Sequence, residues 1–407
     1  MGSKTGLLAE LLSADWLGAR PVALQGSPHV FGRASGALRV RSLLLAASFP
    51  PALGGVETLL YQTNRRLADP PLVVAPWPAA APDMAVRGVR TGLASRALYR
   101  PLWRLHPTLH YTQAFLGPAL QSARSWRPAT IQAGHVYLAP LARLLARRLG
   151  IPYVAYAYGQ EVWRGGQRMG PGAMDQRLRG GALRGASHVL VPGSFTAGLL
   201  DDWGVARERT VSVPYGAEPR PRVAPPEGST LLSVSRLVPR KGIDMVIRAL
   251  RCLPASVDYR IVGSGPDLQR LRGLAAAEGV ADRVTFLGRV DAEALAAEYQ
   301  RCAVFVQPAR RTPNGELEGY GLVYFEAAAW ARPVVAGRSG GEVDAVVDGE
   351  SGLLVDGTSV SEVASAIGGL LADPERLRSM GEAGRRRVET THNWTSAAAV
   401  VDASLRA

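Results

Sequence analysis

Two glutamates with seven residues between them, Glu318 and Glu326, carry the strongest chemical signal in the chain. The stretch E-G-Y-G-L-V-Y-F-E contains two glycines and leads into an apolar segment that ends before a proline. This pattern predicts a helix that begins near Gly321. The unpaired N–H groups at a helix start carry partial positive charge and attract anions. We therefore expect the N–H groups of Gly321, Leu322 and Val323 to bind a phosphate.

The two glutamates suit hydroxyl groups better than phosphates. Glu318, just outside the predicted helix, would repel a bound diphosphate unless it accepted hydrogen bonds from neutral hydroxyls, as a carboxylate does when it holds a sugar ring. Glu326, further along the helix, suits the diol of a ribose. Gly319 and Gly321 allow a bulky ligand to approach the backbone closely, and Tyr320 between them completes the binding segment. The alternative is a capped surface helix with two solvated glutamates.

Four further stretches occur in a fixed order along the chain: G-G-V-E-T at Gly54 to Thr58, V-S-R-L-V-P-R-K-G at Val234 to Gly242, I-V-G-S-G-P at Ile261 to Pro266, and V-T-F-L-G-R-V at Val284 to Val290. Together with the paired glutamates, they resemble the signature of retaining glycosyltransferases of family 4. The resemblance covers roughly Arg41 to the C-terminus. Within that family, P-A-R-R-T-P-N-G-E-L-E-G-Y-G-L-V-Y-F-E-A and A-G-R-S-G-G are most similar to GDP-mannose-dependent mannosyltransferases of the phosphatidylinositol mannoside type.

The resemblance implies the GT-B fold, in which two Rossmann-like, doubly wound α/β domains face each other across a cleft. A chain of 407 residues with 47% hydrophobic residues is also too long for one ordinary core. We expect an N-terminal extension without assigned function at 1–38, an acceptor-binding domain at 39–218 and a nucleotide-sugar-binding domain at 219–385. A final helix at 386–407 is expected to return to the N-terminal domain.

Predicted strands and helices alternate from Arg41 onwards, which points to parallel sheets with crossover helices. The turn-rich stretch from Pro214 to Ser229 separates two such series and is the predicted linker. Helices are expected at 56–67, after Ser194 as N-cap, and at the C-terminus after Asn393 or Thr395. Strands are expected at 41–48, 71–76, 129–133, 153–157 and 188–191 in the first series, and at 230–236, 259–263, 284–288, 304–308, 333–337 and 352–356 in the second.

Departure of a diphosphate requires cations or fixed dipoles, because negative charge builds up on its oxygens. The sequence contains no Asp-x-Asp motif for a divalent metal, so we expect no metal site and no cofactor. Arg236 and Lys241 follow a predicted strand, at the sheet edge where ligands gather in α/β folds. The resemblance assigns both to the diphosphate. The alternative is a solvated basic loop.

Other loops contribute to the expected donor site. Gly54 and Gly55 lie between a strand and a helix, where backbone N–H groups can meet a phosphate, although a glycine pair also makes plain turns. The resemblance places Gly263 near the nucleotide and Arg289 and Val290 beside the base. The G-S-G-P loop has a leucine in place of the third glycine of a dinucleotide fingerprint, which disfavours a nicotinamide cofactor.

His135, in A-G-H-V-Y-L-A-P, is the best catalytic candidate among the six histidines. Other family members place a functional histidine there, although a histidine that only hydrogen-bonds within a loop is the alternative. The H-G-H-E element of the most similar relatives corresponds here to Tyr158, Gly159, Gln160 and Glu161, so neither histidine is kept. In this family the leaving phosphate is thought to accept the proton of the attacking hydroxyl, so no protein nucleophile is assigned. The expected catalytic set is His135, Glu318, Arg236 and Lys241.

The formal net charge of +13 favours anionic partners such as sugar nucleotides and lipid headgroups. Nucleic acid is disfavoured, because no basic stripe with interleaved aromatic residues occurs. The segment from Arg87 to Arg104 mixes arginines with leucine, tyrosine and tryptophan, which suits contact with an anionic membrane or, equally, a half-buried helix with a charged face.

Cys252 and Cys302 both lie in apolar segments, and no secretory signal or apolar run of about 20 residues occurs. We therefore expect a cytoplasmic protein that can lie peripherally on the membrane.

Our working hypothesis is a retaining, metal-independent glycosyltransferase that moves a hexose, above all mannose from GDP-mannose, to a lipid-linked or saccharide hydroxyl. A UDP-sugar donor is the alternative within the same class. A sugar-nucleotide epimerase of the same fold would need no acceptor. A catalytically silent nucleotide-binding subunit is a third alternative, and the intact paired glutamates and basic loop argue against it.

Overall fold

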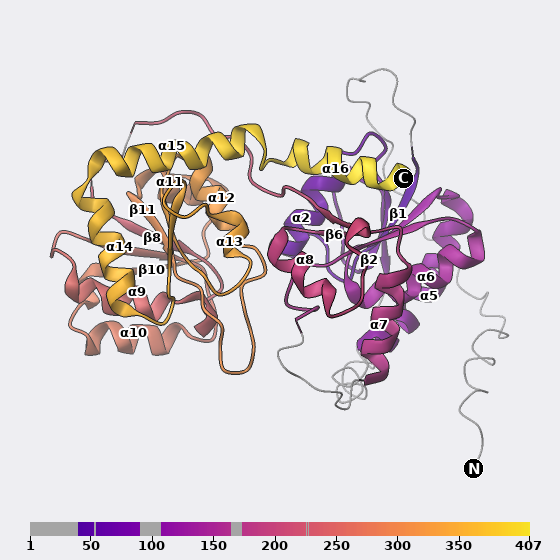
Figure 1. Cartoon of the computed structure of the whole chain (residues 1–407), viewed down its shortest axis with the longest axis horizontal. Coiled ribbons are helices and arrows are strands. Elements are labelled where there is room, and N and C mark those ends of the chain that lie inside the picture. Colours follow the sequence, from indigo (N-terminus) through magenta and orange to yellow (C-terminus); the bar gives the residue numbers. More distant parts are fainter. Residues whose placement is uncertain (1–39, 53, 90–106, 164–172, 225, 227) are drawn as a thin grey trace, which may run out of the picture.

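A computed structural model describes residues 40–407, except 53, 90–106, 164–172, 225 and 227. The chain forms two α/β domains that lie side by side (Figure 1). Helices α15 (Pro374–Thr390) and α16 (Trp394–Arg406) run along one edge of both domains. The predicted fold class, two doubly wound parallel sheets, is confirmed.

In the described part of the chain, the N-terminal domain has a seven-stranded parallel sheet with the order β3-β2-β1-β4-β5-β6-β7. Its strands are short apolar runs, because both faces of a parallel sheet are covered by helices. Leu43 and Leu45 in the first strand pack on one face of the sheet, whereas Leu44 between them packs on the opposite face. The strands are β1 (Ser42–Leu45), β2 (Leu72–Pro76), β3 (Val86–Val89), β4 (Thr130–Ala133), β5 (Tyr153–Tyr156), β6 (His188–Val191) and β7 (Thr210–Ser212).

The helices of this domain divide between the two faces of the sheet. Those that share one face and contact one another are α5 (Pro107–Trp126), α6 (Ala139–Leu149) and α7 (Ala173–Gly185). Helix α8 (Ser194–Asp201) packs on the same face through Leu200, whereas α2 (Gly55–Asn64) packs on the opposite face through Leu59 and Leu60. The 3₁₀ turns are η1 (Val136–Leu138) and η2 (Arg207–Arg209). The cap of α8 differs from the prediction, since Gly193 is its N-cap and Ser194 its first residue.

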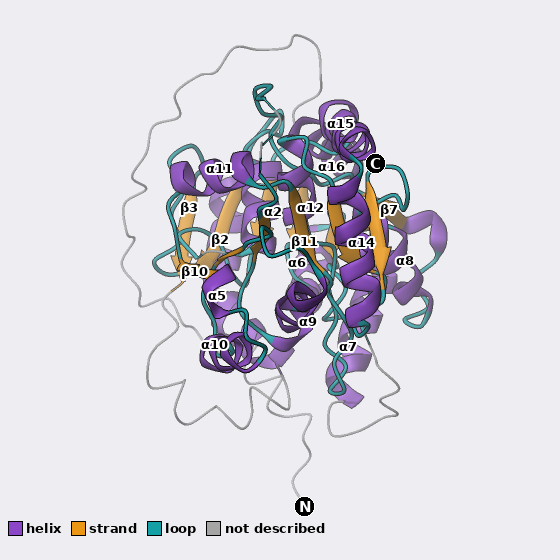
Figure 2. Cartoon of the chain, turned by 90° about the vertical axis from the view of Figure 1, so that its left-hand side faces the viewer, coloured by secondary structure: helices purple, strands orange, loops and turns teal. Residues whose placement is uncertain are grey.

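The C-terminal domain has a six-stranded parallel sheet in the described residues, with the order β10-β9-β8-β11-β12-β13. A strand is present at each site predicted for this half of the chain. The strands form a middle layer with helices on both sides (Figure 2). They are β8 (Leu231–Val234), β9 (Tyr259–Val262), β10 (Val284–Gly288), β11 (Val304–Gln307), β12 (Val334–Gly337) and β13 (Gly352–Val355).

The helices of the C-terminal domain begin after the carboxyl ends of the strands or in the loops that follow them. They are α9 (Ile243–Ala249), α10 (Leu268–Ala277), α11 (Ala292–Arg301), α12 (Leu322–Ala329), α13 (Glu342–Ala345) and α14 (Val360–Ala372), with 3₁₀ turns η3 (Pro239–Lys241), η4 (Leu250–Cys252) and η5 (Ala281–Arg283).

Two connections join the domains. The described residues between β7 and β8 form neither helix nor strand, which fits the predicted linker. The chain then returns through α15 and α16, and α16 packs on α2 of the N-terminal domain. Asn393 is the N-cap of α16 and accepts a hydrogen bond from the N–H of Ser396, one of the two predicted caps. The boundary predicted at residue 385 lies inside α15.

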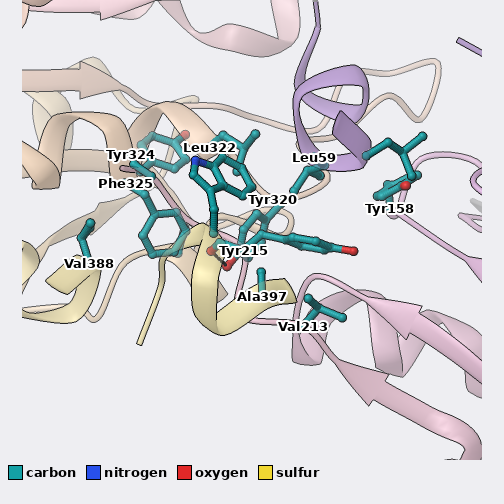
Figure 3. Packing of buried hydrophobic residues seen from close by; sticks show 14 of the residues in the cluster. Leu59, Tyr158, Val213, Tyr215, Tyr320, Leu322, Tyr324, Phe325, Val388 and Ala397 are labelled. Carbon is teal, nitrogen blue, oxygen red and sulfur yellow. Dashed lines mark hydrogen bonds between the residues drawn. The ribbon is translucent and has the colours of Figure 1, made fainter. Parts of the chain in front are cut away.

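One hydrophobic cluster is continuous across both domains (Figure 3). The hydroxyl of Tyr320 donates a hydrogen bond to the carbonyl of Tyr215 in the linker, at 2.8 Å. The ring of Phe325, on α12, stacks on His392 with ring centroids 4.7 Å apart. The start of α12 is therefore packed directly against the connection between the domains.

Some predictions lie outside the described residues. The extension at 1–38 is one of them. In the arginine-rich segment, Arg87 lies in strand β3, which pairs with β2, and the part from residue 90 onwards is not described. None of the helices in the described ranges combines the length and the apolar character that a membrane crossing requires.

Candidate active site

The loops that carry the candidate residues follow the carboxyl ends of strands in both sheets, which is where ligands bind in open α/β folds. They also approach one another between the domains. A Cβ atom on Gly55, at the start of α2, would lie 4.0 Å from Leu322 at the start of α12. A Cβ atom on Gly159, after β5, would lie 3.1 Å from the Cα of Gly319. The two helix starts and the loop after β5 thus border one site.

Glu318 lies in this site between two cations. Its side chain is only 10% exposed, and it forms ion pairs with Arg240, at 3.1 Å, and with Lys241. Burial raises the pKa of Glu318, but the charges of Lys241 and Arg240 outweigh burial and hold the pKa below its ordinary value. Glu318 is therefore ionised near neutral pH. The structure brings Glu318 and Lys241 together as predicted for one site, and it adds Arg240, which the sequence reasoning missed although it adjoins Lys241.

The basic turn is held in place by the loop after β11. The N–H of Arg310 donates a hydrogen bond to the carbonyl of Arg240 at 2.9 Å. The guanidinium of Arg310 forms a bidentate ion pair with the buried Asp244, at 2.9 and 2.8 Å. Because bidentate pairs fix both distance and direction, the loop that leads to Glu318 and the turn that carries Arg240 are rigidly joined.

Arg236 lies earlier in the loop after β8, apart from the Glu318 ion pairs. Its side chain is exposed and takes part in no hydrogen bond or ion pair with the described part of the chain. The structure therefore does not bring it into contact with Lys241 or Glu318. Its exposed guanidinium is a second cationic group on the loop that carries Lys241.

The start of α12 has the geometry expected of a phosphate site. Gly321 is the N-cap, in the left-handed region with φ 90° and ψ 67°, which favours glycine. Among the hydrogen bonds of the described residues, none uses the N–H groups of Gly321, Leu322 or Val323. The side chain of Tyr320 is turned into the interdomain cluster, so this residue can serve a ligand only through its main chain.

Glu326 lies on the next turn of α12 and is half-buried. Its Oε2 accepts a hydrogen bond from the hydroxyl of Tyr299 at 2.8 Å. Burial raises the pKa of Glu326. Its Oε1 accepts no hydrogen bond from the described residues, so one oxygen is available to a ligand hydroxyl.

The predicted nucleotide loops lie beside the loop of Arg236. The Cα of Gly263 packs so closely on the carbonyl of Ser235 that a Cβ atom would overlap it. Arg289 is exposed, and its Nε donates to the hydroxyl of Ser264 at 3.1 Å. Val290 packs against the cluster that also contains Tyr299. These residues therefore border one end of the site.

His135 follows β4 in the N-terminal domain and lies beside Tyr158, in the loop whose Gly159 approaches Gly319. Its Nδ1 accepts a hydrogen bond from the N–H of Ala47 at 3.1 Å. Burial lowers the pKa of His135 to about 4, so the ring is neutral near pH 7. Because Nδ1 accepts a hydrogen bond, the single ring proton lies on Nε2. The ring of Tyr158 packs edge-on against it, with centroids 6.1 Å apart. The neutral ring can donate one hydrogen bond, from Nε2.

The loop of Gly54 and Gly55 contains a carboxylate that the sequence reasoning overlooked. Glu57, in the first turn of α2, accepts a hydrogen bond from the hydroxyl of Ser48 at 2.5 Å. Its Oε2 lies so close to Gly54 that a Cβ atom on Gly54 would overlap it. A phosphate at this helix start would meet a negative charge, whereas a hydroxyl would meet an acceptor. The G-G-V-E-T stretch already contained this signal.

The element formed by Tyr158, Gly159, Gln160 and Glu161 is ordered by its own contacts. Oε1 of Glu161 accepts a hydrogen bond from the N–H of Tyr158 at 2.6 Å, and burial raises the pKa of Glu161. Glu161 thus braces its own loop. Gln160 instead points toward the C-terminal domain, where its Oε1 accepts a hydrogen bond from the N–H of Leu317 at 3.0 Å.

Family models match both halves of the chain. The model of glycosyl transferases group 1 matches residues 217–387. The model of glycosyltransferase family 4 matches residues 53–220.

Two curated relatives share more than a third of their aligned residues with this chain. The GDP-mannose-dependent alpha-(1-6)-phosphatidylinositol monomannoside mannosyltransferase of Mycolicibacterium smegmatis is 38% identical over 293 residues, which are 69% of this chain and 70% of that protein. The protein of the same name from Mycobacterium tuberculosis is 35% identical over 399 residues, which are 90% of this chain and 98% of that protein.

Solved structures with the same architecture are more distant in sequence. Sucrose-phosphate synthase from Thermosynechococcus elongatus superposes with a TM-score of 0.74 at 24% identity, covering 90% of this chain and 98% of that chain. Anabaena Alr3699/HepE in complex with UDP-glucose superposes with a TM-score of 0.71 at 18% identity, covering 90% and 100%. At these identities the likeness establishes the fold alone.

Proposed function

The chain belongs to the glycosyltransferases of family 4, and we propose that it is a retaining, metal-independent mannosyltransferase that uses GDP-mannose and a lipid-linked acceptor. The observation that carries the proposal is Glu318, ionised between Arg240 and Lys241 beside the free N–H groups at the start of α12. In that arrangement the cations and N–H groups can bind a diphosphate, and the adjacent carboxylate can bind a sugar ring.

The donor diphosphate is assigned to cations and to the helix start. Lys241, Arg240 and the exposed Arg236 supply charge, while the N–H groups at the start of α12 supply a fixed dipole. Glu318 then exchanges part of its ion pairing for hydroxyl groups of the sugar, because ionised carboxylates only accept hydrogen bonds. Glu326 receives the ribose through its available oxygen.

The choice of GDP-mannose rests on the two relatives, whose names specify that donor. Their names also specify a phosphatidylinositol monomannoside acceptor. We propose an acceptor of that class, a mannosylated inositol lipid, for the N-terminal side of the cleft. The net charge of +13 supports a cytoplasmic enzyme that approaches an anionic membrane surface to reach it.

The reaction forms a bond between an acceptor oxygen and the anomeric carbon on the face from which GDP departs. The anomeric carbon–phosphate oxygen bond breaks, and the departing phosphate oxygen takes the proton of the attacking hydroxyl. Neither a protein nucleophile nor a metal is needed for this balance. His135 is neutral and donates a hydrogen bond from Nε2 to a substrate hydroxyl, which helps to orient it.

The test is mannosyl transfer by the purified chain in EDTA, with labelled GDP-mannose and vesicles that contain phosphatidylinositol monomannoside. The proposal predicts a lipid product whose new mannose is removed by an α-mannosidase, since retention of the donor's configuration gives an α-linkage. Transfer only from UDP-sugars would show that the donor is a UDP-sugar and not GDP-mannose. Conversion of the nucleotide sugar without any acceptor would favour an epimerase. A requirement for added Mg²⁺ or Mn²⁺ would overturn metal independence.

A further inference from the structure

A loop of the N-terminal domain, residues 158–163, lies against the C-terminal loop that carries Glu318. The two backbones meet at Gly159 and Gly319, where a Cβ atom on Gly159 would lie 3.1 Å from the other Cα. A Cβ atom on Gly319 would overlap the carbonyl oxygen of Tyr158. Glycine at both positions lets the loops come closer than side chains would permit.

Gln160 provides the polar contact between these loops. Its Oε1 accepts the hydrogen bond from the N–H of Leu317, which directly precedes Glu318. Leu317 is 1% exposed. A buried N–H without a hydrogen-bond partner is costly. The N–H of Leu317 therefore favours conformations in which the side-chain carbonyl of Gln160 accepts its hydrogen bond.

An aromatic contact holds the other end of the loop. The guanidinium of Arg311 lies over the ring of Trp163, 4.3 Å from its centroid. Arg310, the preceding residue, is anchored within the C-terminal domain by Asp244. The loop before Glu318 is thus fixed at one end by its own domain and along its length by the other domain.

We infer that Gln160 is a positioning residue, which holds the loop of Glu318 in its sugar-binding arrangement only while the two domains are closed. The inference rests on the proposed function, because it takes the donor sugar to be the ligand of Glu318. The acceptor-binding domain thereby completes the donor site. An open enzyme can hold the nucleotide through the C-terminal domain without aligning Glu318 on the sugar.

A second contact between the domains protects a different set of amides, at the start of α8, so its loss can be distinguished from the loss of Gln160. It adjoins the same loop, since the N–H of Gly341 before α13 donates a hydrogen bond to the carbonyl of Glu318 at 2.8 Å. Asp344, on α13, accepts hydrogen bonds at 2.9 Å from the N–H groups of Ser194 and Phe195 at the start of α8. A carboxylate at a helix start is favoured by the helix dipole. Loss of Asp344 should loosen closure as a whole, whereas loss of Gln160 should disturb only the loop before Glu318.

The first test measures amide hydrogen exchange in the full chain and needs no turnover. Gln160→Met keeps the length of the side chain but removes the acceptor, and Gln160→Glu keeps an acceptor. Exchange in the peptide that contains Leu317 should be about 3- to 10-fold faster in Gln160→Met, the effect of one hydrogen bond, and close to wild type in Gln160→Glu. Gln269→Met, at an exposed glutamine of α10, is the matched control and should change nothing.

The second test measures transfer from GDP-mannose. Gln160→Met should lower kcat about 5- to 10-fold without changing the Kd for GDP, and Gln160→Glu should restore most of the rate. Asp344→Ala should raise amide exchange both in the peptide that contains Leu317 and at the start of α8.

The outcomes separate the inference from the proposed function. Unchanged exchange at Leu317 in Gln160→Met, or equal loss of kcat in both Gln160 variants, would overturn the positioning role. If the wild-type chain transfers no sugar from GDP-mannose, the proposed donor is wrong, and the exchange experiment still decides whether Gln160 holds the loop.

Discussion

The carboxylate of Glu318 lies 3.1 Å from the guanidinium of Arg240, although the two residues are separated by 78 positions in the sequence. Both belong to the C-terminal domain, and Lys241 pairs with the same carboxylate oxygen. The cations assigned to the diphosphate are thus partly neutralised by the residue assigned to the sugar. Binding of a donor must redistribute these contacts.

Glu318→Gln is the first prediction from this pairing. Transfer should fall about 10²- to 10³-fold, because a preorganised acceptor for the sugar hydroxyls is lost. Affinity for GDP should stay equal or increase, since Arg240 and Lys241 are no longer neutralised. Calorimetric titration with GDP and initial transfer rates measure both effects. Glu316→Gln, at an exposed neighbouring glutamate, is the control, and a large loss of GDP affinity in Glu318→Gln would contradict the assignment.

Glu326→Gln tests the ribose assignment. The amide keeps an oxygen for the hydroxyl of Tyr299 but removes the carboxylate acceptor for a diol. Affinity for GDP should fall about tenfold, the value of one hydrogen bond to a charged group. The same substitution should barely affect binding of 2′,3′-dideoxy-GDP, which lacks both hydroxyls. Equal losses for the two nucleotides would place the ribose elsewhere.

Gly321→Ala tests the conformation at the start of α12. The positive φ disfavours alanine, and the new Cβ would overlap the ring of Tyr324. We expect a loss of about 1–3 kcal/mol, seen as a lower melting temperature. Gly369→Ala, within helix α14 and with no atom within 4 Å of the added Cβ, should instead gain about 0.5–1 kcal/mol. Shifts of the same sign in both variants would contradict the cap geometry.

Glu342 gives a pH-dependent prediction. Burial raises its pKa to about 6 from the ordinary 4.5, and the nearby charge of Glu318 adds to the shift. The folded state therefore binds the proton more tightly than the unfolded state does. The stability from this proton is full below about pH 4.5 and is lost as the pH rises through about 6.

Relative to wild type, Glu342→Gln should therefore gain more stability at pH 7.5 than at pH 5. The difference should be about 1 kcal/mol, because the carboxyl of the unfolded state is already mostly ionised at pH 5. The measurement is thermal unfolding of both proteins at the two pH values. Glu350→Gln, at an exposed glutamate, should show no such difference. An equal gain at both pH values would mean that Glu342 is not the titrating group.

Much of the fold follows from local sequence features. Each strand of the second sheet is a short apolar run bounded by turns, as in β11 with V-F-V-Q before Pro308, and such runs are typical of covered parallel strands. The start of α12 was also predictable, because Gly321 interrupts the chain just before an apolar run. Local signals sufficed where the interactions themselves are local.

Other features depend on contacts between distant segments and could not be predicted. Ser194 was expected to cap α8, but Asp344 from the other domain takes that role, so the helix needs no serine N-cap. The link from Gln160 to Leu317 spans 157 residues and exists only because the domains face each other. The pairing of Glu318 with Arg240 similarly requires that the loops after β8 and β11 converge.

Thermal stabilisation by a panel of nucleotides in EDTA tests the central claim most directly. A ligand at 100 times its dissociation constant adds about 2.7 kcal/mol of stability, which is well above the resolution of a melting curve. The account predicts stabilisation by GDP and GDP-mannose, little by UDP or UDP-glucose, and loss of the GDP effect in Lys241→Met. Stabilisation by UDP compounds alone, or by no nucleotide at all, would contradict it.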